Sequence, residues 1–547
     1  MIPIRKSLPN VWLGLPIVLV LLTVWTSTDF PLDYWLHVNA GRWISDQGQL
    51  IEADSFSHTI AGQPVQNQAW LAQWAMYAIH RIGGYPLSQF LAGVSYAAAL
   101  GLIMALSRRR ARRPAVAALW GLIAFALMAS NLGVRPQAAS VLLFALQLTW
   151  LDRLRRPVWL ALACFATEAI WTNTHGAFPL GVVMPVLMMS GAFSEAIRRE
   201  IQRDKGWPAR LISAACSPRV RRLAIASAAA ALGAFINPHP ENTLSYVAGV
   251  SSASAQRGLE EWLPPHVAMP AGAALAIASL VVLGVIVISN RRLRWDELAL
   301  LVPFAILAVG SQRMVAWWGL VLPWVMARSS ATVRFSPTLV RLWQRWSGGP
   351  AAATSPALDA AFVAVAALGV LFCTPWLRPY NLLLPAAKRT AVPIDEPWQL
   401  AEALPRLMIA ASHDDGQKTD EPTRPITWFD SASFIPKGGR TSVRSIAPLS
   451  WGSYLSWHSQ GRIASFVDSR VDFFPDQVWA DYQRIQGAAP DALKILDDYG
   501  VDLVVCGPHN QTLADRLTNS NAWREVYGDS LARAFVRRNT GPLAPAQ

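Results

Sequence analysis

The sequence is poor in charged residues and in cysteine. Only 15% of its 547 residues are Asp, Glu, Lys or Arg, whereas a soluble globular domain carries about 25%. Hydrophobic residues make up 53%, which excludes intrinsically disordered, collagen-like and coiled-coil proteins. The four cysteines (Cys164, Cys216, Cys373 and Cys506) have no paired spacing, so neither a disulfide framework nor a zinc site is predicted. This composition predicts a polytopic membrane protein.

Long apolar runs recur along the first two thirds of the chain. A helix needs about 20 apolar residues to cross a bilayer, and we expect eleven such spans at 11–27, 87–106, 115–131, 137–151, 157–172, 177–194, 222–237, 270–289, 298–311, 312–327 and 357–376. The 25 tryptophans suit helix ends at a membrane–water interface. The predicted fold is mainly α, with about eleven transmembrane helices.

Basic residues are distributed unevenly between alternate connections. One set of connections holds 25 Lys and Arg, including the RRRARR run at 108–113, and the other set holds 5. Because cytoplasmic loops carry the excess of Lys and Arg, we predict a cytoplasmic N-terminus and an extracytoplasmic C-terminus. The basic loops then face anionic lipid, and no nucleic-acid partner is expected.

The C-terminal part of the chain has a different character. Residues 1–376 carry a net charge of +14 and residues 377–547 a net charge of −1. We therefore divide the chain into a transmembrane domain at 1–376, with a first outer loop at about 28–86, and a periplasmic α/β domain at 377–547. Strands are expected at 462–467, 501–506 and 531–537, a helix at 491–499 and a loop at 410–425. Asp468, Arg470 and Asp472 alternate, so on an extended segment they point the same way. They form either a binding edge or, as we favour, a solvated strand face.

Unusual polar residues lie in the connections assigned to the outer side. Asp33 and His37 are four residues apart and share one face if their segment is helical. A carboxylate at the mouth of an outer cleft can act as a general base on an acceptor group. It can equally cap or solvate an interfacial helix, and the spacing leaves both interpretations open.

Three ionisable residues lie at or inside the outer membrane boundary. Arg135 and Arg313 are placed to bind a lipid phosphate bidentately, with snorkelling to headgroups as the alternative. Glu168 lies about one turn inside its span, where ionisable groups are costly and usually functional. A structural pairing with an Arg of a neighbouring helix is its alternative.

The remaining outer residues give weaker signals. Four polar residues lie at predicted outer helix ends: Asn173, His175, Asn237 and His239. Side chains in such positions hydrogen-bond a loop more often than they bind a metal. Metal binding by Asp33, His37 and His58 has no supporting motif. No Walker motif or Gly-rich phosphate loop is present, so an activated substrate or a gradient has to drive any chemistry.

Taken in order, these motifs resemble those of bacterial multi-spanning glycosyltransferases of the GT-C fold, in the ArnT/PMT/RgtA-like superfamily that uses polyprenyl-phosphate-linked sugars. The resemblance covers nearly the whole chain. Its motifs are D-x-W-x-H-x-x-x-G-R-W-I from Asp33, D-S-F-S-H-T from Asp54, V-R-P-Q at 134–137, W-x-N-x-H-G at 171–176, N-P at 237–238, E-W-x-P at 261–264, S-Q-R at 311–313, and, in the tail, W-G-S-Y-L-x-W at 451–457 with F-V-D-S-R-x-D-F at 466–473.

The resemblance implies a hexosyl- or pentosyltransferase that moves a sugar from a lipid-linked donor to a glycan, lipid or protein acceptor at the extracytoplasmic face. It assigns catalysis to Asp33, His37 and Asp54. Binding of substrate and lipid phosphate is expected from His58, Arg135, Gln137, Glu168, Asn173, His175, Asn237, His239, Gln312 and Arg313. The acidic pair of better-known members is absent, which leaves a divalent cation (Mg²⁺ or Mn²⁺) open as cofactor, with no residue assigned to it.

The location that follows is the bacterial inner membrane, as a multi-pass protein. Two alternatives share the same sequence features. One is a non-catalytic lipid or glycan transporter, or a membrane assembly scaffold, in which the arginines bind headgroups and Asp33 is structural. The other is a polysaccharide polymerase or ligase that takes a pyrophosphate-linked glycan.

Overall fold

The chain forms two compact units. The computed structural model describes residues 8–28, 32–201, 206–243, 245, 260–333, 356–389, 397–412 and 442–538. One unit contains Met1–Ser27 and Ile82–Ala391, and the other contains Thr28–Arg81 and Val392–Gln547. Residues of the predicted first outer loop therefore fold together with residues of the C-terminal region.

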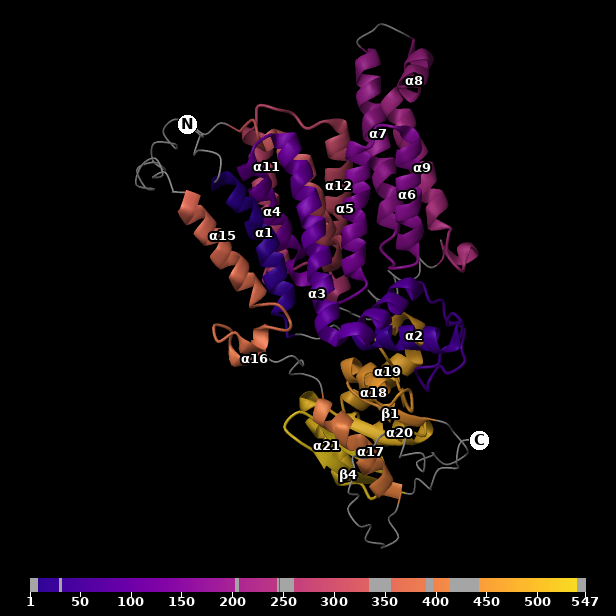
Figure 1. The fold of residues 1–547 in the computed structure, drawn as a ribbon. Coiled ribbons are helices and arrows are strands. Elements are labelled where there is room, and N and C mark those ends of the chain that lie inside the picture. Colours follow the sequence, from indigo (N-terminus) through magenta and orange to yellow (C-terminus); the bar gives the residue numbers. More distant parts are fainter. Residues whose placement is uncertain are drawn as a thin grey trace. The chain divides into compact units, whose positions relative to one another are not determined.

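The first unit is a bundle of helices (Figure 1). The pairs α6 and α9, α12 and α13, α4 and α13, and α7 and α9 pack extensively. The helices are α1 (Leu8–Trp25), the part of α3 (Trp70–Ala111) from Ile82 onward, α4 (Pro114–Met128), α5 (Gln137–Arg153), α6 (Pro157–Thr172), α7 (Pro179–Ile201), α8 (Trp207–Ala215), α9 (Pro218–Ala234), α11 (Pro270–Ile288), α12 (Trp295–Gly310), α13 (Gln312–Ser330), α15 (Pro356–Leu371) and α16 (Ala386–Arg389).

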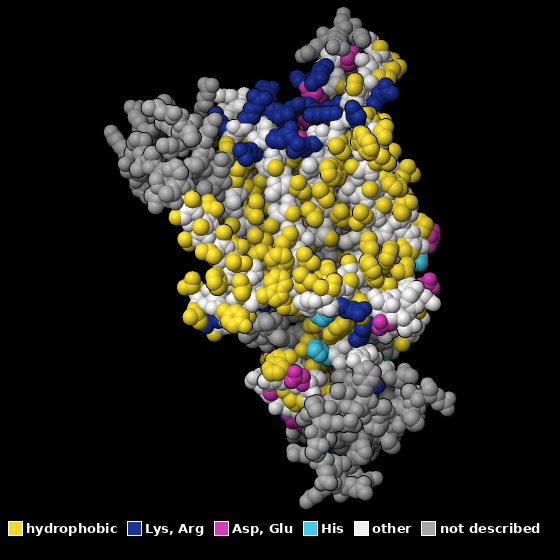
Figure 2. All heavy atoms as spheres, viewed as in Figure 1, with side chains coloured by type: hydrophobic (Ala, Val, Ile, Leu, Met, Phe, Trp, Pro, Cys, Tyr) yellow, Lys and Arg dark blue, Asp and Glu magenta, His cyan; other side chains and the backbone are white. Residues whose placement is uncertain are grey.

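Each of the eleven predicted spans falls mainly within one of these helices. Four helical segments are long and apolar enough to cross a membrane: Trp70–Ala111, Pro114–Asn131, Pro179–Ile201 and Pro270–Ile288. Leu13–Trp25 and Pro157–Thr172 are shorter apolar helices. Figure 2 shows a mostly hydrophobic face along the bundle, with Lys and Arg gathered in a band at one end of the helices. The number of eleven crossings stays a prediction.

Local sequence explains how several helices begin and how closely they approach one another. Proline at the first helical position needs no hydrogen-bond partner, and it starts α4, α6, α9 and α11. A Cβ on Gly191 of α7 would lie 2.4 Å from the Asp296 Cα of α12, so only glycine allows this contact. Gly83 and Gly84 leave helical geometry and break α3 beside the boundary between the units.

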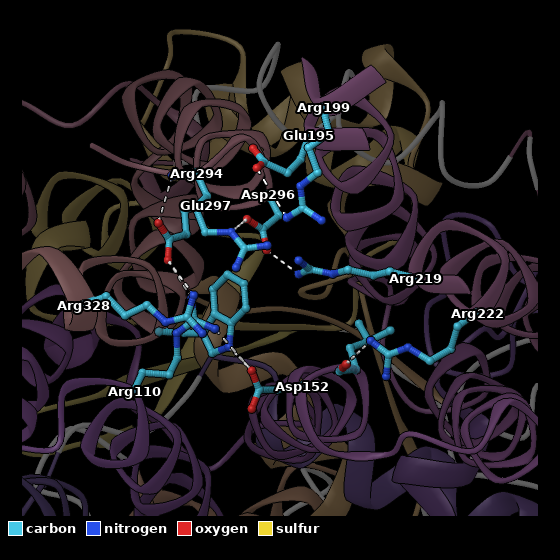
Figure 3. A network of polar contacts seen from close by, with 12 residues as sticks. Arg110, Asp152, Glu195, Arg199, Arg219, Arg222, Arg294, Asp296, Glu297 and Arg328 are labelled. Atoms are coloured by element: carbon cyan, nitrogen blue, oxygen red, sulfur yellow. Dashed lines mark hydrogen bonds and ion pairs between the residues drawn. The ribbon is translucent and has the colours of Figure 1, made fainter. Parts of the chain in front are cut away.

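Arg110 joins three helix ends at one end of the bundle. Its Nη1 lies 3.3 Å from Asp152 Oδ1 of α5, and its Nη2 lies 2.7 Å from Glu297 Oε1 of α12. The guanidinium stacks 3.8 Å from the ring centroid of Trp324 in α13, whose Nε1 donates to Asp152 over 2.9 Å. Figure 3 shows these charged side chains converging.

The adjacent acidic residue extends this network. Asp296 is buried and forms ion pairs with Arg219 of α9 and Arg294. Arg291 and Arg328 lie 3.7 Å and 3.9 Å from Glu297 Oε1. Below, the Arg110 end means the helix ends that carry this network, and the Arg135 end means the opposite ends of α5 and α13.

The second unit contains a five-stranded sheet of order β2-β1-β3-β5-β4. Strands β2, β1 and β3 are parallel, and β5 is antiparallel to both β3 and β4. Its elements are α2 (Tyr34–Gln47), α17 (Trp398–Ser412), β1 (Val443–Ile446), α18 (Leu449–His458), β2 (Ile463–Ser465), α19 (Asp476–Gln486), α20 (Ala492–Asp498), β3 (Leu503–Cys506), α21 (Gln511–Thr518), β4 (Trp523–Gly528) and β5 (Arg533–Arg537).

The tail elements predicted from the sequence are present as β2, α20, β3 and β5. The predicted loop at 410–425 lies outside the described residues from 413 onward. The first-loop segment contributes directly to the core of this unit, because Ile60 belongs to the same buried cluster as Phe466 and Val504. Ser57 also forms a parallel bridge with Ser465 of β2.

Candidate active site

Asp33 and His37 lie together at the start of α2. Asp33 occupies the N-cap position, but its side chain makes no capping hydrogen bond. Its Oδ2 lies 3.5 Å from His37 Nε2, and the two side chains are 25% and 13% exposed. The pair is therefore partly accessible, and the carboxylate and the imidazole lie close to each other.

Aromatic side chains pack α2 against α18 of the tail. Trp35 stacks on Trp457 with ring centroids 5.7 Å apart and meets Tyr454 edge-on at 5.4 Å. Asn39 Nδ2 donates to the Ser453 carbonyl over 2.9 Å. These contacts fix the helix that carries Asp33 and His37. The W-G-S-Y-L-x-W motif thus supplies packing partners for the first loop.

Asp54 takes part in a buried ion cluster. Its Oδ2 accepts hydrogen bonds from Ser57 N over 2.9 Å and from Ser57 Oγ over 2.6 Å, and its Oδ1 pairs with Arg470. Arg470 also binds Asp468, with Nε 3.0 Å from Oδ1. Burial lowers the pKa of Arg470, but Asp468 and Asp54 raise that pKa above its usual value, so the guanidinium stays charged.

This cluster corrects one expectation for the tail. Asp468 is 1% exposed and Arg470 side chain 14% exposed, so they do not lie on a solvated strand face. The segment enters a short 3-10 turn at Val471–Phe473 instead of continuing as a strand. Alternation alone missed this because the carboxylate partner comes from residue 54.

His58 also joins the first loop to the tail. Its Nε2 lies 3.2 Å from the Ser445 carbonyl of β1, and its ring meets Phe466 edge-on with centroids 5.5 Å apart. Thr59 Oγ1 donates to the Phe466 carbonyl over 2.6 Å. These observed contacts are structural in kind, and the binding role expected for His58 stays a prediction.

In the first unit, Arg135 and Arg313 meet on one carboxylate. Arg135 Nη1 lies 3.2 Å from Glu261 Oε2, and Arg313 Nη1 lies 3.0 Å from Glu261 Oε1. The Arg313 guanidinium also lies 5.2 Å from the Trp262 ring centroid. The exposed fractions are 25% for Arg135, 19% for Arg313 and 38% for Glu261. Two cations therefore share one half-exposed anion at the Arg135 end.

Glu261 is the residue that sequence reasoning missed at this position. The E-W-x-P motif at 261–264 marked it, but no role followed from the motif. Its short 3-10 turn (Glu260–Trp262) is tied to the start of α13, because Ser311 Oγ donates to the Glu261 carbonyl over 3.1 Å and Gln312 N to the Leu263 carbonyl over 3.0 Å. Gln312 therefore helps to place the carboxylate through its backbone.

Gln137 opens α5 two residues after Arg135. Its side chain is 3% exposed, and its Nε2 is buried with no hydrogen-bond partner among the residues described. A buried amide donor of this kind is uncommon in folded proteins. Gln137 is thus a neighbour in sequence of Arg135, and its predicted binding role stays a prediction.

Asn173 and Asn237 hold neighbouring turns together. Asn173 Nδ2 donates to the Ile236 carbonyl over 2.5 Å, and Asn237 Nδ2 donates to the Ala234 carbonyl over 2.9 Å. His239 N donates to Asn237 Oδ1 over 2.9 Å. Ala177 N donates to His175 Nδ1 over 3.3 Å. These four residues shape the loops after α6 and α9, and their contact with a substrate is untested.

Glu168 is fully buried between α6 and α7. A Cβ on Gly181 would lie 2.1 Å from Glu168 Oε2, and both carboxylate oxygens are buried without a hydrogen-bond partner in the described part of the chain. The alternative interpretation, a structural pairing with a neighbouring arginine, is not among the contacts described. Because no surface of Glu168 is exposed, a role in binding would require the helices to separate.

A metal site does not emerge from the described ranges. No group of three or more His, Cys, Asp or Glu side chains among these residues is arranged to hold a metal ion. Asp33 and His37 make a pair, while the buried Asp54 and Asp468 both bind Arg470. The described residues therefore do not form a set of ligands for a divalent cation.

Comparisons with known proteins place this arrangement in a fold class. No protein-family model matches the sequence, and no curated protein matches it. Solved structures do: the chain has the fold of the multi-spanning GT-C glycosyltransferases, as its motifs predicted.

These structures include several of the oligosaccharyltransferase AglB from Archaeoglobus fulgidus. The complex with an inhibitory peptide and a dolichol-phosphate has a TM-score of 0.53 at 13% identity, covering 92% of this chain and 70% of that one. The form tethered to an acceptor peptide with the NVT sequon has a TM-score of 0.52 at 13% identity, covering 99% and 74%. At this identity the likeness establishes the fold.

Proposed function

We propose that this protein is a glycosyltransferase that moves a sugar from a polyprenyl-phosphate-linked donor to an acceptor at the extracytoplasmic face of a bacterial inner membrane. The observation that carries the proposal is the meeting of Arg135 and Arg313 on Glu261. Two guanidinium groups that meet on a partly exposed carboxylate lie close enough together to bind a phosphate monoester or diester. The similar AglB structure contains a dolichol-phosphate, which supports a lipid phosphate as the ligand.

The proposed reaction inverts the configuration at the anomeric carbon. The acceptor oxygen or nitrogen forms a bond to that carbon while the bond from the carbon to the phosphate oxygen breaks. Asp33, oriented by His37 at 3.5 Å, takes the proton from the acceptor. Arg135 and Arg313 stabilise the negative charge that develops on the departing lipid phosphate. The lipid-linked bond supplies the energy, so no nucleotide is consumed.

Asp54 has a different part in this proposal. Its oxygens already accept hydrogen bonds from Ser57 and pair with Arg470. If Asp54 bound a substrate instead, the buried Arg470 would lose one of its two acidic partners. We therefore propose that Asp54 acts as a positioning residue that holds the first loop, while Asp33 is the general base.

The decisive experiment compares wild type with Asp33→Asn, and uses Asp46→Asn as a matched control because Asp46 is an exposed carboxylate on the same helix. Each protein is purified in detergent, and its co-purifying lipids are identified by mass spectrometry. We expect Asp33→Asn to retain a polyprenyl-phosphate sugar, and Asp46→Asn to resemble wild type.

The identified donor is then supplied to each protein in vesicles, and product is measured. Loss of a general base costs typically 10²–10⁴-fold, so we expect Asp33→Asn to lose at least about a hundredfold in transfer. Equal transfer by Asp33→Asn and wild type would remove Asp33 from the mechanism. Phospholipid alone in all preparations, or lipid movement without product, would favour the transporter or scaffold alternative.

A further inference from the structure

An apolar groove runs between α1 and α3 in the first unit. It has a volume of about 460 Å³, and its walls include Leu13 and Ile17 from α1 and Gly101 and Met104 from α3. A Cβ on Gly101 would lie 3.7 Å from Ile17 Cδ1, which is ordinary contact distance. Close packing therefore does not require glycine here, and its small size instead keeps the groove open.

Three arginines form the rim of this groove. Arg108, Arg109 and Arg112 line it, all three are exposed, and none has an ion pair or side-chain hydrogen bond among the described residues. Arg110 differs, because it points into the network with Asp152 and Glu297. The basic run therefore divides into one structural arginine and three whose charge is available to a ligand.

The length of the groove matches one membrane leaflet. From Gly101 to Arg112 a helix rises about 16 Å at roughly 1.5 Å per residue. The hydrocarbon core of a bilayer is about 30 Å thick, so its half thickness is close to this rise. An acyl chain that follows the wall from Gly101 thus brings its headgroup to the level of the arginines.

Charge and polarity together define the occupant. The groove lining formed by the described residues includes no Asp or Glu, so a bound anion meets no repulsion from these residues. Guanidinium groups bind phosphate oxygens bidentately, and the apolar wall excludes a free inorganic anion as the complete ligand. A zwitterionic lipid would place its cation beside three uncompensated arginines.

We propose that this groove is a specific binding site for one anionic phospholipid of the leaflet at the Arg110 end. One acyl chain lies along Leu13, Ile17 and Met104, and the phosphodiester binds Arg108, Arg109 and Arg112. The site is separate from the Arg135–Glu261–Arg313 group, because Arg108 and Arg135 lie at opposite ends of the bundle helices. The proposal does not depend on the protein's being a transferase.

The test measures retention of phosphatidylglycerol by the full-length protein, using native mass spectrometry with phosphatidylcholine as the zwitterionic comparison. The variants are Arg108→Gln/Arg109→Gln/Arg112→Gln, which removes the rim charge, and Ala105→Phe, which fills the groove beside its exposed wall. Their controls are Arg153→Gln/Arg155→Gln/Arg156→Gln and Ala166→Phe, at equally exposed positions on α5, its following loop and α6.

We expect wild type to retain one phosphatidylglycerol in preference to phosphatidylcholine. Each arginine near an anionic lipid contributes about 1 kcal/mol, and about 1.4 kcal/mol is a tenfold change in affinity. The rim variant should thus bind roughly a hundredfold more weakly, and Ala105→Phe at least about tenfold more weakly. Both controls should bind like wild type.

Three results would overturn the proposal. Equal loss in the control arginine variant would show general charge attraction, and full binding by Ala105→Phe would show that no chain enters the groove. Equal retention of phosphatidylcholine would show that the arginines do not select the headgroup. Size-exclusion profiles and melting temperatures establish that each variant is folded, so a loss of binding reports on the site.

Discussion

The two ends of helix α13 carry arginines in opposite surroundings. At its C-terminal end, Arg328 belongs to a network in which Glu297 is completely buried and faces three arginines (Figure 3). At its N-terminal end, Arg313 shares the half-exposed Glu261 with Arg135. Both ends pair arginines with a glutamate, but Glu297 is buried and faces three arginines, whereas Glu261 is partly exposed and faces two.

This contrast separates structural arginines from arginines that can serve a ligand. A buried acid with several cations is costly to disturb, because removing one partner leaves uncompensated charge in a medium of low polarity. A partly exposed pair contributes little to stability and can exchange its partner for a phosphate. Burial, rather than residue type, thus indicates which arginines are available to a ligand.

The largest effect is expected at the buried network. Glu297→Gln removes the carboxylate that binds Arg110 at 2.7 Å and leaves the buried Arg110 with Asp152 as its remaining acidic partner among the described residues. We expect a loss of about 3–5 kcal/mol in the free energy of unfolding, measured as a large fall in melting temperature in detergent. Glu241→Gln is the control, because Glu241 is 64% exposed; an equal fall in that variant would refute the comparison.

At the Arg135 end, we expect a smaller change in the free energy of unfolding but a clear loss of activity. Arg313→Gln removes one of the two proposed phosphate ligands, and a lost charge-stabilising donor typically costs about 10²-fold in rate. Transfer should fall by roughly a hundredfold, while the melting temperature stays close to that of wild type. Arg292→Gln, an exposed arginine of the opposite end, should keep full activity. Unfolding of Arg313→Gln would instead assign Arg313 a structural role.

The smallest effect on stability is expected for the carboxylate that Arg135 and Arg313 share. Glu261→Gln removes the anion that competes with a lipid phosphate for Arg135 and Arg313. Stability should change by less than about 1 kcal/mol, because the pair is partly exposed. Binding of polyprenyl phosphate, measured by titration against the purified protein, should become several-fold tighter. Weaker binding would mean that Glu261 holds the arginines in place for the ligand.

The helical parts of the fold were predictable because hydropathy is a local property. Apolar runs mark α4 and α11 directly, and prolines mark where they begin. In the tail, β3 follows from the run Leu503–Cys506, whose four residues are all buried. Each of these signals is contained in a short window, and no distant partner is needed to interpret it.

The grouping of the candidate site residues was not predictable in the same way. Arg135 and Glu261 are 126 positions apart, and Asp54 and Arg470 are 416 positions apart. A pattern of spacing within a window contains no information about such pairs. The position of Arg135 and Arg313 at the predicted membrane boundary suggested them as phosphate ligands, but it did not reveal their shared carboxylate.

The sequence by itself determined most helices of the bundle, three of the five tail strands (β2, β3 and β5) and the end of the bundle at which basic residues gather. Only the tertiary structure decided that residues 28–81 fold with the tail, that Arg110 turns inward while Arg108, Arg109 and Arg112 line a groove, and that Asp54 is held by Arg470. The physical reason is that backbone structure follows local hydropathy and turn chemistry. The state of a charged side chain depends on which distant groups burial brings beside it.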